Sequence, residues 1–582
     1  MKILGYSGLN HDSAVALLDA GKIAFAIESE KVTRYKHEMT PFPEHAFRHL
    51  LGHAGVSLSD IDYLAVNYEA GFWANKGYLP HFYACLRQRN FDWGIIANSA
   101  VLAGSHNPII VKYSISDDVP RILPVRHHLA HLASTFLYSP FEEAAVAVID
   151  AAGEIDSTST YLCRGREIRK LGAMTLPTNS LGSVYMMSTR HLGYRLIGDE
   201  YKVMGLASFG ESYQPFRQFF EQLIVLLPDG AYRIDPRLAG RIALNGCQFP
   251  KEIADRLGGP RAAGDDFGAV HKSFAFELQR RIEEAILHVT RHLRKKTGVR
   301  NLCMAGGVAL NSVANGKVLE DSGFDEVFIP PVPHDAGTSL GAAAYLHYYR
   351  FLQERPAPLT HAYLGPSFDD DQIERELDRC RQRYVRLDDP AAAAADLLCE
   401  GRIIAWFQGA TEYGPRALGN RSILADPRHA EMQHRVNAMI KERESYRPFA
   451  PAVLEEYAAC YFPSLRSSPY MLFVVDASEK ARKEIPAVVH VNGTARPQTV
   501  TKAANPRFFA LIDAFRERTG VPAVLNTSFN VAGEPIVNTP SDAIRCFNGS
   551  GLEAMVIGSY LLSKPCPAGG GAGGGMTARA RR

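Results

Sequence analysis

The chain has 582 residues, which is too long for one hydrophobic core, so at least two domains are expected. Its 46% hydrophobic and 22% charged residues are typical of a soluble globular protein, and a net charge of +2 argues against a large nucleic-acid-binding surface. The nine cysteines form no Cys-x-x-Cys pair, which argues against a zinc or redox motif and favours a cytoplasmic location. Neither a signal peptide nor a membrane span is expected, because polar residues interrupt the first apolar segment and no apolar run reaches about 18 residues.

The first strands are predicted to form an antiparallel meander. Lys2 to Gly5, Ser13 to Leu18 and Ile23 to Glu28 are apolar runs separated by polar or glycine-containing turns. The first turn contains His11 and Asp12, and its small polar residues could present backbone N–H groups to a phosphate. Most turns of this composition bind no ligand, so the turn by itself does not establish a phosphate site.

The segment His127-His128-Leu129-Ala130-His131 is the clearest candidate site. If a helix follows Pro124, His127 and His131 lie on one face and can bind the same ion or ligand. A solvated helix face or hydrogen-bonded core imidazoles would give the same spacing. His128 lies about 100° from His127 around such a helix, so we expect it outside this ligand set.

The meander pattern then recurs. Ala144 to Asp150, Ser157 to Cys163 and Glu167 to Leu171 form three strands joined by turns. Two copies about 140 residues apart predict a duplicated α/β domain with a nucleotide between its halves. Asp150, at the end of its strand, would face phosphate and metal, although many strand-end aspartates only start a turn.

Two later turns add candidate residues. After a long helix predicted from Phe267 to Lys296, a strand runs into Gly306-Gly307 and Asn311, where glycines would let a ring or sugar approach the backbone. A plain tight turn is the alternative. Asp335 opens a small-residue helix and is positioned as a third ligand, or simply as a helix N-cap.

Prolines between residues 355 and 366 predict a linker. We therefore expect a first domain over residues 1–355, a linker over 356–366, a second α/β domain over 367–564 and a disordered glycine-rich tail over 565–582. The second domain should begin helix, strand, helix, strand, over Asp370 to Gln382, Tyr384 to Leu387, Pro390 to Glu400 and Ile403 to Phe407.

The loops of the second domain carry cations beside Gly, Pro and Asn. They are Arg416, Arg421, Lys441, Arg443, Arg447 and Arg496. Arginine forks and lysine charges hold phosphates, whereas scattered surface cations are the alternative. A last strand carries Asn526 and Ser528 into a polar loop.

These blocks, in this order, resemble the O-carbamoyltransferase family of antibiotic-tailoring and nodulation-factor enzymes. The resemblance runs from residue 3 to about residue 560 and rests on His11-Asp12-Ser13, His127-x-x-x-His131, Asp150-x-x-Gly153-Glu154, Gly306 to Asn311, Asp335-x-Gly337, Gly414 to Ser422, Arg447 to Pro451 and Asn526 to Asn530.

The resemblance implies an actin-like, ATP-binding first domain, similar to that of tRNA threonylcarbamoyl transferases, followed by a YrdC-like domain. The second domain would make carbamoyl adenylate from carbamoyl phosphate and ATP, and the first would pass the carbamoyl group to a hydroxyl of a small-molecule acceptor. Iron or another divalent cation, and Mg²⁺, are the implied metals. The chain would act as a monomer or homodimer, without nucleic acid or membrane.

Site roles follow from the same resemblance. The metal ligands would be His127, His131 and Asp335, and the catalytic set would add His11, Asp12 and Asp150. Cofactor-binding residues would be Gly306, Gly307, Asn311, Arg416, Lys441, Arg447, Arg496, Asn526 and Ser528. Two positions depart from the family pattern: Ala532 replaces a basic residue, and His334 replaces a small one.

Other readings stay open at this stage. One is a tRNA-modifying enzyme of the threonylcarbamoyl type, and another is an ATP-switched, actin-like assembly module. Hydrogenase-maturation relatives carry zinc-finger cysteine pairs that this chain lacks. The acceptor is not identified by the sequence; its contacts are expected from the loops 70–110 and 210–265.

Overall fold

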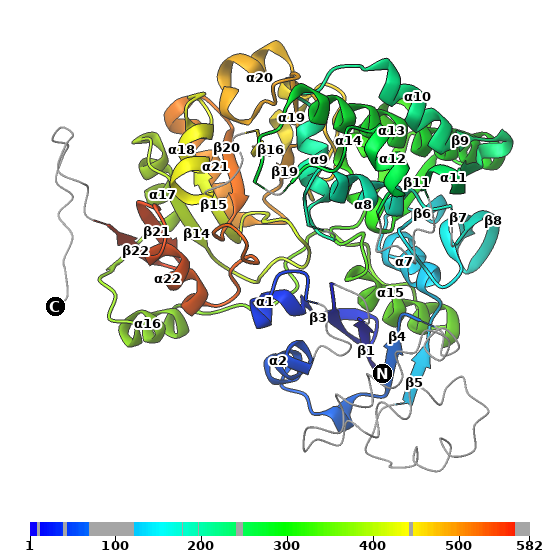
Figure 1. Cartoon of the computed structure of the whole chain (residues 1–582). Coiled ribbons are helices and arrows are strands. Elements are labelled where there is room, and N and C mark those ends of the chain that lie inside the picture. The colour runs from blue at the N-terminus through cyan, green and yellow to red at the C-terminus, as the bar shows by residue number, and fades with distance from the viewer. Residues whose placement is uncertain are drawn as a thin grey trace. The chain divides into compact units, whose positions relative to one another are not determined.

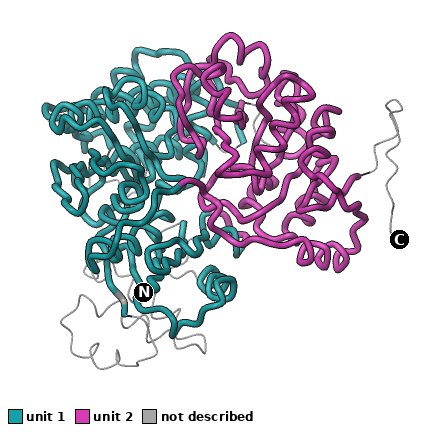
Figure 2. Tube along the Cα trace, turned by 180° about the vertical axis from the view of Figure 1, so that it is seen from behind, with its two compact units in different colours: residues 1–33, 37–359 teal, residues 34–36, 360–582 magenta. Residues whose placement is uncertain are grey.

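The computed structural model describes residues 1–8, 12–38, 44–68, 121–176, 179–195, 197–239, 248–262, 264–441 and 446–564. The chain divides into two compact units (Figure 2). Unit 1 comprises Met1–Thr33 and His37–Leu359, and unit 2 comprises Arg34–Lys36 and Thr360–Arg582. The predicted domain limits and linker stay predictions, and the predicted disordered tail lies outside the described residues.

The first sheet of unit 1 has five strands in the order β3-β2-β1-β4-β5. They are β1 (Lys2–Ser7), β2 (Ala14–Asp19), β3 (Lys22–Glu28), β4 (Tyr63–Val66) and β5 (Arg121–Pro124). β1, β2 and β3 are antiparallel, as the meander predicts, whereas β4 and β5 continue parallel to β1. β1 and β2 are almost continuously buried because helices cover both faces of the sheet.

The second sheet repeats this plan in the order β12-β11-β6-β7-β8. Its strands are β6 (Glu143–Ile149), β7 (Asp156–Arg164), β8 (Glu167–Thr175), β11 (Asn301–Ala305) and β12 (Glu326–Phe328). Again three antiparallel strands are followed by two parallel ones. The predicted duplication and the α/β, actin-like class are therefore confirmed (Figure 1).

Two helices pack against each other and against these sheets. α7 (His127–Phe136) follows β5 but packs on β6 and β11, while α15 (Gly337–Tyr345) follows β12 but packs on β1, β2 and β4. The contacts are close: a Cβ on Gly5 would lie 1.8 Å from the Ser339 carbonyl oxygen, and one on Gly341 would lie 1.9 Å from that of Ala130. These glycines therefore let the helices approach their neighbours.

The remaining elements of unit 1 surround this centre. They are α1 (Ser29–Thr33), α2 (Glu44–Ala54), η1 (Leu58–Asp60), α8 (Leu181–His191), α9 (Glu200–Ala207), α10 (Gln214–Leu223), β9 (Ile224–Leu226), η2 (Pro228–Gly230), β10 (Tyr232–Ile234), α11 (Pro236–Ala239), α12 (Lys251–Arg256), α13 (Ala269–Thr297), η3 (Gly307–Leu310), α14 (Ser312–Asp321) and η4 (Leu346–Arg350). The predicted long helix is confirmed as α13, which ends at Thr297 and is capped by Gly298 in the left-handed conformation.

Unit 2 is built on an eight-stranded mixed sheet in the order β13-β22-β21-β14-β15-β20-β16-β19. The strands are β13 (Val385–Arg386), β14 (Ile404–Phe407), β15 (Arg421–Ala425), β16 (Ala450–Leu454), β19 (Gln498–Val500), β20 (Ala523–Ser528), β21 (Ala554–Ile557) and β22 (Tyr560–Ser563); β17 (Val475–Asp476) pairs separately with β18 (Thr494–Ala495). The helices are α16 (Asp370–Arg379), α17 (Pro390–Cys399), α18 (Met432–Val436), η5 (Asn437–Lys441), α19 (Glu455–Tyr461), α20 (Glu479–Glu484), η6 (Pro486–Val488), α21 (Pro506–Thr519) and α22 (Pro540–Asn548). The predicted opening of this domain is confirmed as α16, β13, α17 and β14.

Within the described ranges, no helix combines the length and apolar character that crossing a membrane requires.

Candidate active site

The histidine pair lies at the start of α7. The helix begins at His127, so His127 and His131 share a face as the spacing predicts. The carboxylate of Glu154 accepts a hydrogen bond from the backbone N–H of His127, at 2.9 and 3.1 Å from its two oxygens. Glu154 therefore caps this helix in place of an N-cap side chain and fixes where the pair begins.

Four buried side chains converge here: His127, His131, Asp150 and Asp335. Oδ2 of Asp150 lies 3.0 Å from Nε2 of His127 and 3.3 Å from Nε2 of His131. Oδ1 of Asp335 lies 3.5 and 3.6 Å from the same two nitrogens. We call these four residues the histidine–aspartate cluster. It contains Asp150 as well as the three residues predicted as metal ligands.

The charges in the cluster stabilise one another. Burial alone would lower the pKa of His127, but the carboxylates of Asp335 and Asp150 outweigh it and raise that pKa to about 10. Burial likewise opposes ionisation of Asp150, yet hydrogen bonds from both imidazoles hold its pKa well below the usual range. The pKa of Asp335 is lowered as well, against burial and the Asp150 charge, by the charge and hydrogen bond of His127.

The cluster suits a metal ion. One candidate ligand atom from each residue lies within 4.8 Å of all the others, and all four side chains are buried. Two imidazole nitrogens and two carboxylate oxygens are a donor set that divalent transition metals accept. The residues present therefore fit the iron-type cation that the family resemblance implies, and its identity stays a prediction.

Neighbouring backbone groups orient Asp150. Its Oδ1 accepts hydrogen bonds from the N–H of Ala151 at 2.7 Å and of Gly307 at 3.2 Å, so Oδ2 is left to face the imidazoles. The preceding residue, Gly306, has φ 94° and approaches the adjacent strand so closely that a Cβ would lie 2.2 Å from the carbonyl oxygen of Ile149. Gly306 and Gly307 thus position the cluster, whatever else they bind.

Tyr68 and His128 lie beside the histidine–aspartate cluster. Tyr68, two residues after β4, stacks on His127 with ring centroids 4.6 Å apart and an interplanar angle of 17°. His128 lies outside the cluster, as expected, and its Nδ1 is 2.5 Å from the hydroxyl of Ser159. Burial and the adjacent His127 lower the pKa of His128 well below its usual value, so this imidazole is neutral.

The other predicted residues of unit 1 are placed as follows. His11 lies outside the described residues. Oδ1 of Asp12 is 2.8 Å from Nδ1 of His37, and these two form a second group of possible ligands with Glu30. The side chain of Asn311 caps α14 and exchanges hydrogen bonds with Gln279.

In unit 2, Arg416, Arg447 and Arg496 are partly buried, and nothing is described of the Lys441 side chain or of Arg443. The amide nitrogen of Asn526 donates to the Ala417 carbonyl and to Gln498, and the hydroxyl of Ser528 donates to Asn530. Their predicted role in cofactor binding stays a prediction.

Arg421 has a structural role instead. It is fully buried, and its guanidinium donates to the carbonyl oxygens of Gln408, Asn420 and Gly409 at 2.6, 3.1 and 3.1 Å. Glu412, which the motifs did not single out, accepts from the backbone N–H of Leu418, Asn420 and Arg421. These two buried charges hold the Gly414 to Ser422 loop in shape, so Arg421 is not a free phosphate ligand.

The comparisons agree with this architecture. The family model described as "Carbamoyltransferase N-terminus" matches residues 2–344, and "Carbamoyltransferase C-terminus" matches residues 395–564. The chain is 39% identical to nodulation protein NolNO of Sinorhizobium fredii, covering 95% of this chain and 79% of that protein. It is 36% identical to an uncharacterized protein of Synechocystis sp., covering 97% and 96% of the two chains.

A further relative, 3'-hydroxymethylcephem-O-carbamoyltransferase of Streptomyces clavuligerus, is 28% identical over 94% of this chain and 96% of that enzyme. The resemblance predicted from the sequence motifs is thus confirmed along nearly the whole chain. The chain therefore belongs to the carbamoyltransferase family and is an enzyme of carbamoyl transfer.

Proposed function

We propose that this enzyme is an ATP-dependent O-carbamoyltransferase that makes carbamoyl adenylate from carbamoyl phosphate and ATP and transfers the carbamoyl group to a hydroxyl of a small-molecule acceptor. The observation that carries the proposal is the buried histidine–aspartate cluster, in a duplicated actin-like domain that matches the N-terminal part of the family. Such a domain binds nucleotide between its halves, and the cluster offers a charged, water-poor environment for transfer.

In this proposal His127, His131 and Asp335 hold a divalent cation, iron for preference, with Asp150 beside them. A cation held there would supply a Lewis acid for the carbamoyl carbonyl and would stabilise negative charge on its oxygen. The protein residues position this chemistry. Gly307 and Ala151 fix the Asp150 carboxylate through their N–H groups, and Glu154 fixes the start of α7.

Unit 2 would prepare the carbamoyl donor. Its proposed ligands for carbamoyl phosphate and ATP, which Mg²⁺ would accompany, are Arg416, Lys441, Arg447, Arg496, Asn526 and Ser528. Adenylation supplies a good leaving group, which the carbamoyl carbon needs because a plain alcohol is a weak nucleophile. Gly306, Gly307 and Asn311 would lie along the adenylate in unit 1, and His11 and Asp12 would act near the acceptor.

The acceptor class follows from the relatives. One carries the name of a hydroxymethylcephem carbamoyltransferase and others are named nodulation proteins, so we propose a small natural-product alcohol as acceptor and a cytoplasmic enzyme of natural-product or antibiotic biosynthesis.

The test measures AMP formation from ATP by the full chain. AMP should appear only when carbamoyl phosphate is present, and a product with one added carbamoyl group should appear by mass spectrometry when candidate alcohols are supplied. His127→Ala should abolish acceptor carbamoylation, whereas His45→Ala, an exposed histidine on α2, should leave it unchanged. AMP formation independent of carbamoyl phosphate would refute the proposal.

A further inference from the structure

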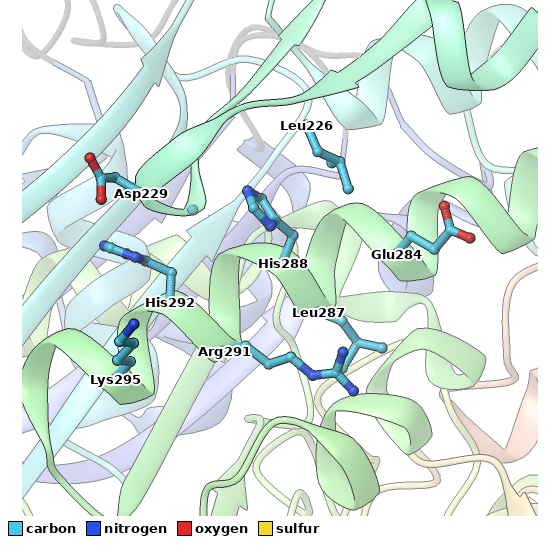
Figure 3. Close-up of a pocket in the computed structure, with 9 residues that line it drawn as sticks. Leu226, Asp229, Glu284, Leu287, His288, Arg291, His292 and Lys295 are labelled. Atoms are coloured by element: carbon cyan, nitrogen blue, oxygen red, sulfur yellow. The ribbon is translucent and has the colours of Figure 1, made fainter.

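Unit 1 contains a hollow of about 460 Å³ between α13 and the tip of the β9–β10 hairpin (Figure 3). Among its lining residues are Leu226, Asp229, His288, Arg291, His292 and Lys295. We call it the α13 hollow. Its volume lies within the range of about 300–1,000 Å³ that small-molecule sites have.

The hollow is preformed by the hairpin tip. Asp229 and Gly230 both adopt left-handed conformations, with φ 58° and 70°. Gly230 lies directly against α13, where a Cβ would be 2.5 Å from the Cβ of His292. Nε2–H of His288 donates to the Leu227 carbonyl at 2.7 Å, which fastens the hairpin to the helix. Only glycine allows so close a contact at position 230.

Basic side chains follow one stripe of α13. Residues 288, 291, 292 and 295 are three and four apart and share a face, and Figure 3 shows His288, His292 and Lys295 in succession along the helix. Lys295 lies in the last turn, where a cation also favours the helix C-terminus. His288 and Arg291 lie further inside the helix, so the end of the helix does not explain them.

These groups are incompletely neutralised. Of the two acids, Glu284 is already engaged by Arg280 and Arg281. Within the part of the chain that the structure describes, Lys295 makes no ion pair, and the enclosed Nε2 of His292 has no hydrogen-bond partner. Asp229 alone opposes them. Nε of Arg291 donates to the Asp321 carbonyl at 2.8 Å and Nε2 of His288 is used by Leu227, so the donors left for an oxyanion are the ammonium of Lys295 and the terminal nitrogens of Arg291.

The walls add an apolar component. Leu226 from β9 and Leu287 from α13 line the hollow beside the basic stripe. A ligand with a negatively charged head and an apolar body could therefore contact both.

The α13 hollow is separate from the histidine–aspartate cluster. Lys295 precedes β11 by one short turn, and Asn301, the first residue of β11, donates to the carbonyl of Glu143 at the start of β6. Asp150 follows the other end of β6. Seven strand residues span roughly 20 Å, which separates the Lys295 end of the hollow, where the head group binds, from the cluster.

We propose that the α13 hollow is a second binding site, which takes a small organic oxyanion with an apolar body, either a carboxylate or a phosphate ester. The basic stripe of α13 binds the head group, and Leu226 and Leu287 contact the body. This proposal holds whichever alcohol accepts the carbamoyl group.

Isothermal titration of the full chain tests this, with phenyl phosphate and phenylacetate as probes of the two head groups. At least one probe should bind, and Lys295→Glu should weaken that binding at least tenfold. Lys251→Glu is the matched control: the residue is exposed on α12, does not line the hollow, and should change the affinity less than twofold.

Thermal unfolding of both variants establishes that they are folded, which is expected because both lysines are exposed. Binding of neither probe, or equal affinity in Lys295→Glu and the unchanged chain, would overturn the proposal. If only phenyl phosphate binds in a Lys295-dependent way, the ligand is a phosphate ester; if only phenylacetate does, it is a carboxylate.

Discussion

The charge on His127 should couple folding to pH in the metal-free protein. Its pKa is about 10 in the folded chain and about 6.5 when the residue is free of its partners. Because the folded-state pKa is the higher one, this stabilisation is complete below pH 6.5 and is lost as pH rises towards 10. The full difference corresponds to on the order of 5 kcal/mol.

Between pH 7 and 9, the free energy of unfolding should therefore fall by about 2 to 3 kcal/mol through this group. The carboxyls of Asp150 and Asp335 do not titrate in this window, since their pKa values are lowered. Urea denaturation in the presence of a chelator at pH 7, 8 and 9 measures the fall. His127→Gln provides the reference, because it keeps a polar side chain but removes the titrating one.

The same charge must be lost when a metal binds, because only a neutral imidazole nitrogen is a ligand. Titration with Fe²⁺ or Zn²⁺ at pH 7.5, in buffers of different ionisation enthalpy, should show release of about one proton for this group. The reasoning is refuted if His127→Gln has the same pH dependence of stability as the unchanged chain and if metal binding releases no proton.

Three substitutions test the structural roles of single residues. Gly306→Ala should lower the free energy of unfolding by about 3 kcal/mol or more in urea denaturation, because it combines a positive φ with a clash against the Ile149 carbonyl. Arg421→Met should cost at least about 3 kcal/mol in the same assay, since it leaves several buried carbonyl groups without a donor. Tyr68→Ala should weaken metal binding about 10- to 100-fold in calorimetry by releasing the His127 ring, whereas Tyr68→Phe should bind metal more tightly than Tyr68→Ala.

Matched control variants distinguish these specific effects from a general loss of stability. Gly52→Ala on α2 should not destabilise the protein, because nothing lies within 4 Å of the new Cβ. Arg300→Met removes an arginine whose side chain is 77% exposed and should cost less than about 1 kcal/mol. A Gly306→Ala variant as stable as Gly52→Ala, an Arg421→Met variant as stable as Arg300→Met, or equal metal affinity in the two Tyr68 variants would contradict the respective argument.

The sequence predicts the features that depend on residues close together in the chain. The two meanders follow from alternating apolar runs and turns, and the spacing of His127 and His131 predicts their common face once a helix begins after Pro124. The sequence identifies Asp150 as a strand-end acid, but it does not show that this carboxylate meets both imidazoles, since that depends on how β6 lies beside α7.

Other features depend on contacts between distant segments. In the sequence, nothing distinguishes Tyr68 from other aromatic residues that follow a strand, and only the structure shows its ring stacked on His127. Its position near the end of β4 is a signal that it lies close to the site. Arg421 resembles a phosphate ligand by its neighbours Asn420 and Ser422. Only the buried carbonyl groups around it, with Glu412 as counter-charge, reveal that it shapes the loop.

Because α7 and α15 each pack on the sheet of the other half, unit 1 does not divide into two independent halves. Each helix leaves the sheet that precedes it and covers the strands of the other, much as protomers do in a domain-swapped dimer. His127 and His131 travel with one exchanged helix, and Asp335 lies just before the other. Neither half of the duplication can therefore assemble the cluster alone. Fragments cut between α7 and β6, which separate the two histidines from Asp150 and Asp335, should regain metal binding only by complementation, when both pieces are present and the exchange is completed across the break.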